Sequence, residues 1–183
     1  KGSPVVGALT VLILQQGTIF LTDTHVNFDP TAEQLCELGK LAADEIRRFG
    51  IQPKAAFLSH SNFGSQNTTS AAKVREATAM FMERYPDIEA DGEMHADAAL
   101  DEKVRLDLLP DSKLTGAANL LVCPNLDSAN IARNLVKVWG NGVTVWPLLL
   151  GLDKEAHVAT TSNSPRGIFN MAAVALANVN RND

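Results

Sequence analysis

The chain has 183 residues and a formal net charge of −5, with 45% hydrophobic and 20% charged residues. This length and hydrophobic content are typical of a folded domain and exclude a disordered chain. The acidic balance argues against a nucleic-acid-binding module, which normally presents a basic face. Two cysteines, Cys36 and Cys123, are too few for a disulfide framework and lack the paired spacing of a metal site. We interpret both as core thiols and expect a reducing, cytoplasmic location.

An apolar run near the N-terminus, Val5 to Leu14, is similar in composition to the core of a signal peptide. It is too short to span a bilayer, and no small-residue cleavage site follows it. We therefore interpret it as a buried helix or strand. Since it almost directly follows Lys1 rather than an initiator methionine, we expect the chain to be a piece of a longer protein.

Short apolar runs then alternate with amphipathic helices. We predict strands at 18–22, 55–58, 88–91, 119–123 and 143–146. We predict helices at 30–49, capped by Asp29, and at 70–84, 97–108, 127–139 and 168–179. This alternation predicts an α/β fold in three layers, with a mostly parallel sheet covered by helices on both faces.

Two sets of apolar residues define the expected core. The helical spacing of the first predicts one buried helix face: Leu35, Leu38, Ala42, Ile46 and Phe49. The second set comes from the predicted strands: Phe20, Leu58, Leu121 and Val145.

Polar residues follow several predicted strands, where α/β proteins bind ligands. In the loop 59–65, the side chains of Ser61, Asn62 and Ser65 and the amide of Gly64 could donate to a phosphate. The alternative is a turn that caps its own helix, and the residues alone favour this alternative. Asn125 follows another strand in the same way.

Alternating polar residues in the segment 91–97 raise the question of a metal site. Asp91, Glu93, His95 and Asp97 would project to one side of an extended segment and could ligate a divalent ion. A solvated strand end is the interpretation that we prefer, so we expect no metal ligands. The histidines have no neighbours in sequence that mark a catalytic triad.

Four blocks of the sequence, 23–35, 58–65, 91–100 and 122–131, resemble the phosphate acetyl/butyryl transferase family. They are most similar to the branch fused to bacterial hybrid NADP-dependent malic enzymes. The resemblance implies an isocitrate/isopropylmalate dehydrogenase-like fold and a chain that is roughly the second half of a transferase domain. It divides the chain into the end of a preceding subdomain (1–16), a second subdomain (17–150), and a return segment with a C-terminal helix (151–183).

The resemblance fails where active members of the family carry catalytic groups. Thr160, Thr161 and Gly167 stand where those enzymes have a serine, an arginine and an aspartate. A neutral hydroxyl cannot replace the charge and the bidentate donors of a guanidinium. We therefore expect no catalytic residues. The resemblance implies that acetyl-CoA or phosphate is held by eight residues: Ser61, Asn62, Gly64, Ser65, Asn125, Asn130, Thr160 and Thr161.

The function that this resemblance implies is a regulatory, oligomer-forming domain that senses acetyl-CoA within a malic enzyme. NADP and a divalent metal would be bound by other domains of that protein, and this domain would form a homodimer. Two alternatives stay open: an active phosphate acetyltransferase, and a dimerisation module without a ligand. The sign of regulation is not predictable from these residues.

Overall fold

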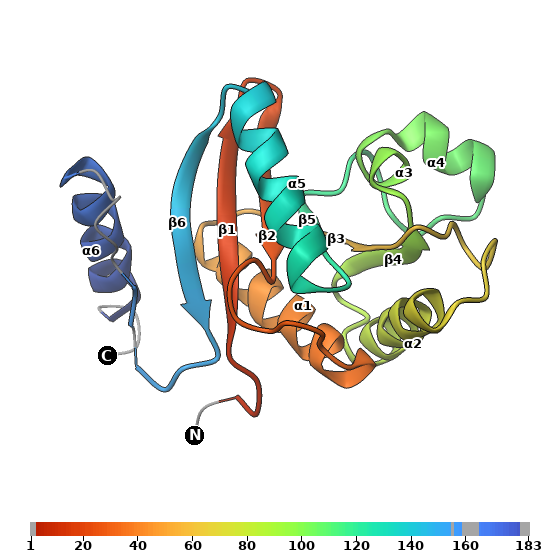
Figure 1. Ribbon diagram of the computed structural model, residues 1–183, viewed down its shortest axis with the longest axis horizontal. Coiled ribbons are helices and arrows are strands. Elements are labelled where there is room, and N and C mark those ends of the chain that lie inside the picture. The colour runs from red at the N-terminus through yellow and green to blue at the C-terminus, as the bar shows by residue number, and fades with distance from the viewer. Residues whose placement is uncertain (1–2, 155, 159–164, 180–183) are drawn as a thin grey trace.

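The computed structural model describes residues 3–154, 156–158 and 165–179. Six strands form one sheet in the order β4-β3-β5-β2-β1-β6 (Figure 1). Their bounds are β1 Gly7–Leu14, β2 Gly17–Thr22, β3 Lys54–Leu58, β4 Glu89–Met94, β5 Leu120–Val122 and β6 Val143–Leu150. The expected α/β sheet is thus confirmed in its general form.

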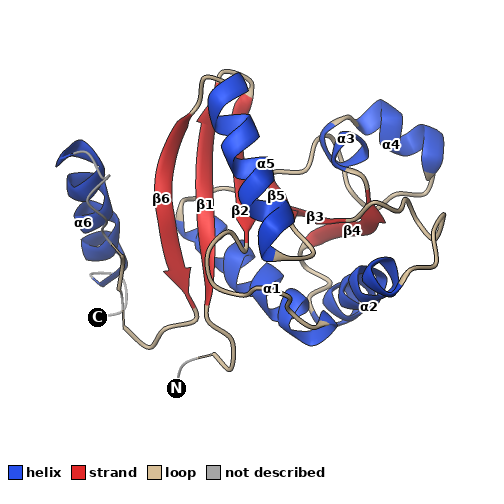
Figure 2. Cartoon of the chain, viewed as in Figure 1, coloured by secondary structure: helices blue, strands red, loops and turns tan. Residues whose placement is uncertain are grey.

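Helices cover both faces of the sheet (Figure 2). One apolar cluster joins the sheet to α1 (Ala32–Arg48) and α2 (Thr69–Arg84). A second cluster, with other strand residues, joins it to α3 (Ala96–Leu100) and α5 (Leu126–Trp139), with α4 (Glu102–Leu108) adjoining α3. The last helix, α6 (Pro165–Val179), lies beside β6. None of the helices in the described ranges is long and apolar enough to cross a membrane.

The sheet is mixed rather than wholly parallel. Strands β2, β5, β3 and β4 run parallel, whereas β1 pairs antiparallel with both β2 and β6. The cause is local: only Gln15 and Gln16 separate β1 from β2, and so short a connection can join only antiparallel neighbours. The apolar run at 5–14 therefore contributes a strand to the same sheet. The domain limits at 1–16, 17–150 and 151–183 stay a prediction.

The core contains most of the residues expected there. Phe20, Leu58 and Leu121 are buried, and Val145 packs half-buried against the first cluster. On α1, the expected buried face is confirmed except at Phe49, which is 40% exposed because it lies beyond the last helical residue as the C-cap.

Two predicted helix boundaries need correction. Thr31, not Asp29, caps α1: its hydroxyl accepts from the Gln34 amide, and the Gln34 side chain accepts from the Thr31 amide. The single helix predicted at 97–108 is instead two short helices. The break occurs at Asp101, whose carboxylate caps α4 by accepting from the amides of Lys103 and Val104.

Candidate functional site

The polar edge of the sheet lies at the carboxyl ends of the parallel strands. The chain leaves β3 through α2 toward β4 on one side, and leaves β5 through α5 toward β6 on the other. Since β3 and β5 are hydrogen-bonded neighbours, the connections diverge between them. Such a switch point is where open α/β sheets form a ligand crevice.

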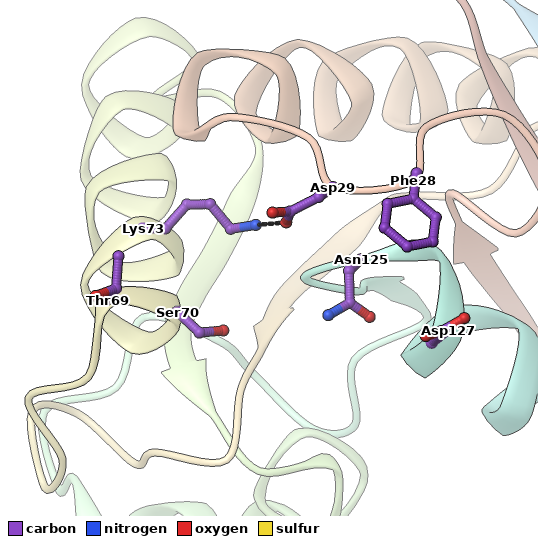
Figure 3. Close-up of a pocket in the computed structure, with 7 residues that line it drawn as sticks. All are labelled: Phe28, Asp29, Thr69, Ser70, Lys73, Asn125 and Asp127. Atoms are coloured by element: carbon purple, nitrogen blue, oxygen red, sulfur yellow. Dashed lines mark hydrogen bonds and ion pairs between the residues drawn. The ribbon is translucent and has the colours of Figure 1, made fainter.

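A cavity of about 390 Å³ lies at this switch point (Figure 3). It is lined by residues from the loop after β2, the first turns of α2 and the start of α5: Phe28, Asp29, Thr69, Ser70, Lys73, Asn125 and Asp127. We call it the Lys73 cavity. The ammonium of Lys73 donates to Asp29 Oδ1 and to the carbonyl of Pro124 (3.1 Å). Because an ammonium has three N–H donors, the third can serve a ligand.

Two helix N-termini border the Lys73 cavity. Thr68 caps α2 by accepting from the amide of Ala71 (3.2 Å), and Asn125 caps α5 by accepting from the amide of Ser128 (2.9 Å). The partial positive charge of a helix N-terminus favours anions. Together with Lys73, these helices make the cavity suited to a phosphoryl group or a carboxylate, although the carboxylates of Asp29 and Asp127 oppose a high anion affinity.

The neighbouring loop, 59–66, is folded around a carboxylate of the protein itself. Glu93 Oε1 accepts from the Ser61 hydroxyl (2.7 Å) and from the Gly64 amide (2.9 Å). Gly64 has a φ of +88°, which a residue with a side chain rarely adopts, and this conformation accompanies the amide's contact with Glu93. The same carboxylate pairs with Arg75, whose Nε donates to Oε2 (3.0 Å) and whose Nη2 donates to Oε1 (2.9 Å).

These contacts control the ionisation of Glu93, whose side chain is fully buried. Burial would raise its pKa, but the hydrogen bonds from Arg75, Ser61 and Gly64 outweigh that effect and lower the pKa to about 2. Glu93 is therefore a carboxylate at neutral pH. It occupies two of the donors that the sequence suggested for a phosphate, the Ser61 hydroxyl and the Gly64 amide.

The structure describes six of the eight residues predicted to bind acetyl-CoA or phosphate. Asn125 lines the Lys73 cavity, and Ser61, Asn62, Gly64 and Ser65 form the adjacent loop. Asn130 instead donates to the carbonyl of Thr24 (3.4 Å). The other two, Thr160 and Thr161, lie outside the described residues. The site assignment as a whole stays a prediction.

Within the loop 59–66, Asn62 and Ser65 make hydrogen bonds with groups other than Glu93. Asn62 Oδ1 accepts from the His95 amide (2.7 Å), so its Nδ2 is the donor that a ligand could use. The Ser65 hydroxyl accepts from the Asn62 amide (3.0 Å).

The sequence reasoning missed Lys73, and the signal was available: a lysine in the second turn of a helix that directly follows a predicted strand and polar loop.

The polar segment 91–97 is not the solvated strand end that we expected. Asp91 and Glu93 are buried, because the fold supplies donors to both. Asp91 accepts from the Ser112 hydroxyl (2.7 Å) and from the Lys113 amide (2.9 Å). Within the described residues, no cluster of three His, Cys, Asp or Glu side chains is placed to hold a metal ion.

Both cysteines are buried in the core, as expected. Burial raises the pKa of Cys36 to about 11 and that of Cys123 to about 12. Because the thiolate is the reactive form, neither thiol is a nucleophile at neutral pH.

Comparisons with known proteins agree with this architecture. The sequence profile of the family "Phosphate acetyl/butaryl transferase" matches residues 1–176. A phosphotransacetylase structure from Streptococcus pyogenes superposes with a TM-score of 0.92 at 31% identity, covering 97% of this chain and 56% of that one.

Two relatives represent the two kinds of enzyme that this chain resembles, malic enzymes and phosphate acetyltransferases. The NADP-dependent malic enzyme of Salmonella typhimurium is 53% identical over 176 residues, which are 96% of this chain and 23% of that enzyme. The phosphate acetyltransferase of Haemophilus influenzae is 36% identical over 156 residues, which are 85% of this chain and 22% of that enzyme. The chain thus spans less than a quarter of either relative. It belongs to the phosphate acetyl/butyryl transferase family and is 49–53% identical to the phosphotransacetylase-like segment of the NADP-dependent malic enzymes from Salmonella typhimurium and Escherichia coli.

Proposed function

We propose that this chain is a regulatory phosphotransacetylase-like domain of a malic enzyme, which binds acetyl-CoA without transferring its acetyl group. One feature of the sequence carries the proposal: the family resemblance implies that active transferases have a serine and an arginine where this chain has Thr160 and Thr161. Acyl transfer to phosphate needs charge stabilisation in its transition state, which a threonine hydroxyl cannot supply. The higher identity to malic enzymes than to phosphate acetyltransferases supports the same conclusion.

The Lys73 cavity is where we place the ligand. The third donor of Lys73 and the N-termini of α2 and α5 can hold a phosphoryl or carbonyl oxygen, and Asn62 and Ser65 adjoin from the loop. Such donors stabilise a bound ground state without providing the added stabilisation of a transition state. Acetyl-CoA then regulates malate turnover only if its affinity differs between two states of the oligomer.

The wider assignments belong to the same proposal. The protein would oxidise and decarboxylate malate with NADP and a divalent metal held by other domains, and would form a homodimer through this domain in the cytoplasm. The isocitrate dehydrogenase-like label for the fold also remains a proposal.

The test measures the complete natural protein in two assays. In the first, acetyl phosphate and CoA are supplied, and we expect no acetyl-CoA synthesis above background. In the second, acetyl-CoA should change malate turnover, and Lys73→Gln should raise the acetyl-CoA concentration needed for half of the effect about tenfold, equivalent to one lost charge-assisted hydrogen bond. Lys103→Gln, which removes an exposed charge from α4, is the matched control and should leave the response unchanged.

Three outcomes distinguish the candidate functions. Robust acetyl-CoA synthesis would identify an active phosphate acetyltransferase, which the structural similarity to phosphotransacetylases favours as the second candidate. No transfer and no response to acetyl-CoA would leave a dimerisation module. A normal response in Lys73→Gln would show that the ligand binds elsewhere.

A further inference from the structure

Besides Lys73 on α2, a second cation calls for explanation. It is Arg133, which lies on α5 two turns after the first residue of that helix. Its Nη2 donates to Asn134 Oδ1 (3.1 Å), whereas its Nε is shielded from water without a hydrogen-bond partner. Burial lowers the pKa of Arg133, and no neighbouring carboxylate contributes an opposite effect. Within the described part of the chain, no acidic side chain forms an ion pair with this guanidinium.

The surroundings of Arg133 supply further polar groups rather than a counter-charge. Asn134 Nδ2 donates to Asn130 Oδ1 (2.9 Å), and Asn130 Nδ2 donates to the carbonyl of Thr24 (3.4 Å). This hydrogen-bonded series connects α5 to the loop after β2, where His25 lies beside Thr24. We call His25, Asn130, Arg133 and Asn134 the Arg133 cluster.

His25 can contribute a donor to this cluster. Its Nδ1 lies 2.7 Å from the Thr24 hydroxyl, which lies 2.7 Å from the Thr10 hydroxyl. Burial and the positive charge of Arg133 lower the pKa of His25 and outweigh the opposing effect of Asp23, which favours the neutral ring. If the Thr24 hydroxyl donates to Nδ1, the ring proton lies on Nε2, where it can serve a ligand.

A nearby acid, Asp23, already has hydrogen-bond donors of its own. Asp23 is buried, and its carboxylate accepts from the backbone amides of Ala8, His25, Val26 and Asn27. A carboxylate with this many donors is already compensated. Arg133 is thus a partly desolvated cation whose charge no group of the described chain balances, and such a charge lowers stability unless an anion joins it.

We propose that the Arg133 cluster is a second anion site, which binds a phosphate group. A guanidinium holds a phosphate through two parallel N–H···O bonds, and rotation of this long side chain would present its Nε and Nη donors to the ligand. His25 Nε2–H supplies a third donor. The site stands apart from the Lys73 cavity and does not depend on acetyl-CoA binding there.

Calorimetric titration of the complete protein with inorganic phosphate tests the site. The measurement is made in a Lys73→Gln background, so that binding in the Lys73 cavity does not contribute. We expect one saturable phosphate per chain, bound at least tenfold more weakly after Arg133→Gln, with an intermediate affinity for Arg133→Lys, which keeps the charge but loses the planar pair of donors. Lys137→Gln, one turn further along α5, removes an exposed charge and should change the affinity less than twofold.

Two results would overturn the proposal: no saturable phosphate binding in the Lys73→Gln protein, or equal affinity with and without Arg133. Circular dichroism of each variant verifies that the fold is retained.

The source of the phosphate is then assigned with coenzyme A and 3′-dephospho-coenzyme A. If Arg133→Gln abolishes the difference in affinity between these two ligands, the cluster binds the 3′-phosphate of the nucleotide. If the variant weakens inorganic phosphate alone, the cluster binds free phosphate. Either result supports a phosphate site at Arg133.

Discussion

Arg75 and Arg133 occupy comparable places in two helices that follow neighbouring parallel strands, but their surroundings differ. Arg75 on α2 donates two hydrogen bonds to the buried carboxylate of Glu93 and a third to the carbonyl of Gln66 (3.0 Å). Among the described residues, the one hydrogen bond of the Arg133 guanidinium on α5 goes to the amide oxygen of Asn134. The first guanidinium completes a network within the protein, whereas we propose that the second binds an external anion.

This difference shows how a carboxylate of the protein itself can occupy the donors of a loop that could otherwise bind an anion. The Ser61 hydroxyl and the Gly64 amide make the contacts with Glu93 that they could have made with a phosphate. A covalently attached carboxylate has no translational entropy to lose, so it competes strongly with a ligand for the same donors. We therefore regard the loop 59–66 as structural at its centre and place ligand binding at Lys73 and Arg133.

The largest effect should come from Arg75→Met. This change leaves the buried carboxylate of Glu93 without its cationic partner. Because the Arg75 side chain is 40% exposed and Ser61 and Gly64 still donate to Glu93, we expect a loss of about 1–3 kcal/mol in free energy of unfolding. Urea unfolding at pH 7 provides the measurement. Arg47→Met is the control, because Arg47 pairs with an exposed Asp87 and should contribute at most about 1 kcal/mol. Equal losses in the two variants would contradict the structural role of the Arg75–Glu93 pair.

The second expected effect is that the free energy of unfolding depends on pH through the ionisation of Glu93. Its folded-state pKa of about 2 is below the ordinary value of 4.5, so the folded protein binds fewer protons than the unfolded chain between these values. The stability that Glu93 contributes is therefore complete above about pH 4.5 and is lost as the pH falls toward 2.

The urea midpoint measured from pH 7 to pH 2 tests this dependence. Glu93→Gln should unfold at lower urea at pH 7, and the difference from the unmodified protein should shrink below pH 4.5. A difference that stays constant across this range would show that the ionisation of Glu93 does not contribute.

A smaller effect is expected from phosphate itself. A ligand at ten times its dissociation constant raises the free energy of unfolding by about 1.4 kcal/mol. Phosphate at this concentration should raise the thermal midpoint of the Lys73→Gln protein relative to chloride at equal ionic strength. The shift should disappear when Arg133→Gln is added, and its persistence would place the phosphate elsewhere.

The smallest effect should come from Arg133→Met in the absence of phosphate. The substitution removes a charge that no carboxylate balances and retains an apolar side chain of similar length, so we expect the free energy of unfolding to change by less than about 1 kcal/mol. Comparison with Arg75→Met in the same urea titration tests the contrast directly. A loss as large as that of Arg75→Met would reveal an internal partner for Arg133.

Several features of the fold and site were not predictable from local patterns. The mixed direction of the sheet depends in part on β6, which pairs antiparallel with β1 although the two strands are far apart in sequence. The burial of Glu93 depends on Arg75, which is 18 residues away in sequence. The place of Lys73 early in α2 could be inferred from the sequence, but the cavity that it lines forms only because α2 and α5 begin beside each other.

The sequence by itself determined the alternation of strands and helices, the buried face of α1 and the family resemblance, because periodicity, capping and block similarity are local properties of the chain. Only the tertiary structure decided which polar groups neutralise one another. Glu93 and Asp91 look alike as solvent-exposed acids in the sequence, and both are buried because distant donors reach them. Charge compensation acts through space over a few ångströms, so contacts between distant segments, not neighbours in sequence, determine which cations remain available to a ligand.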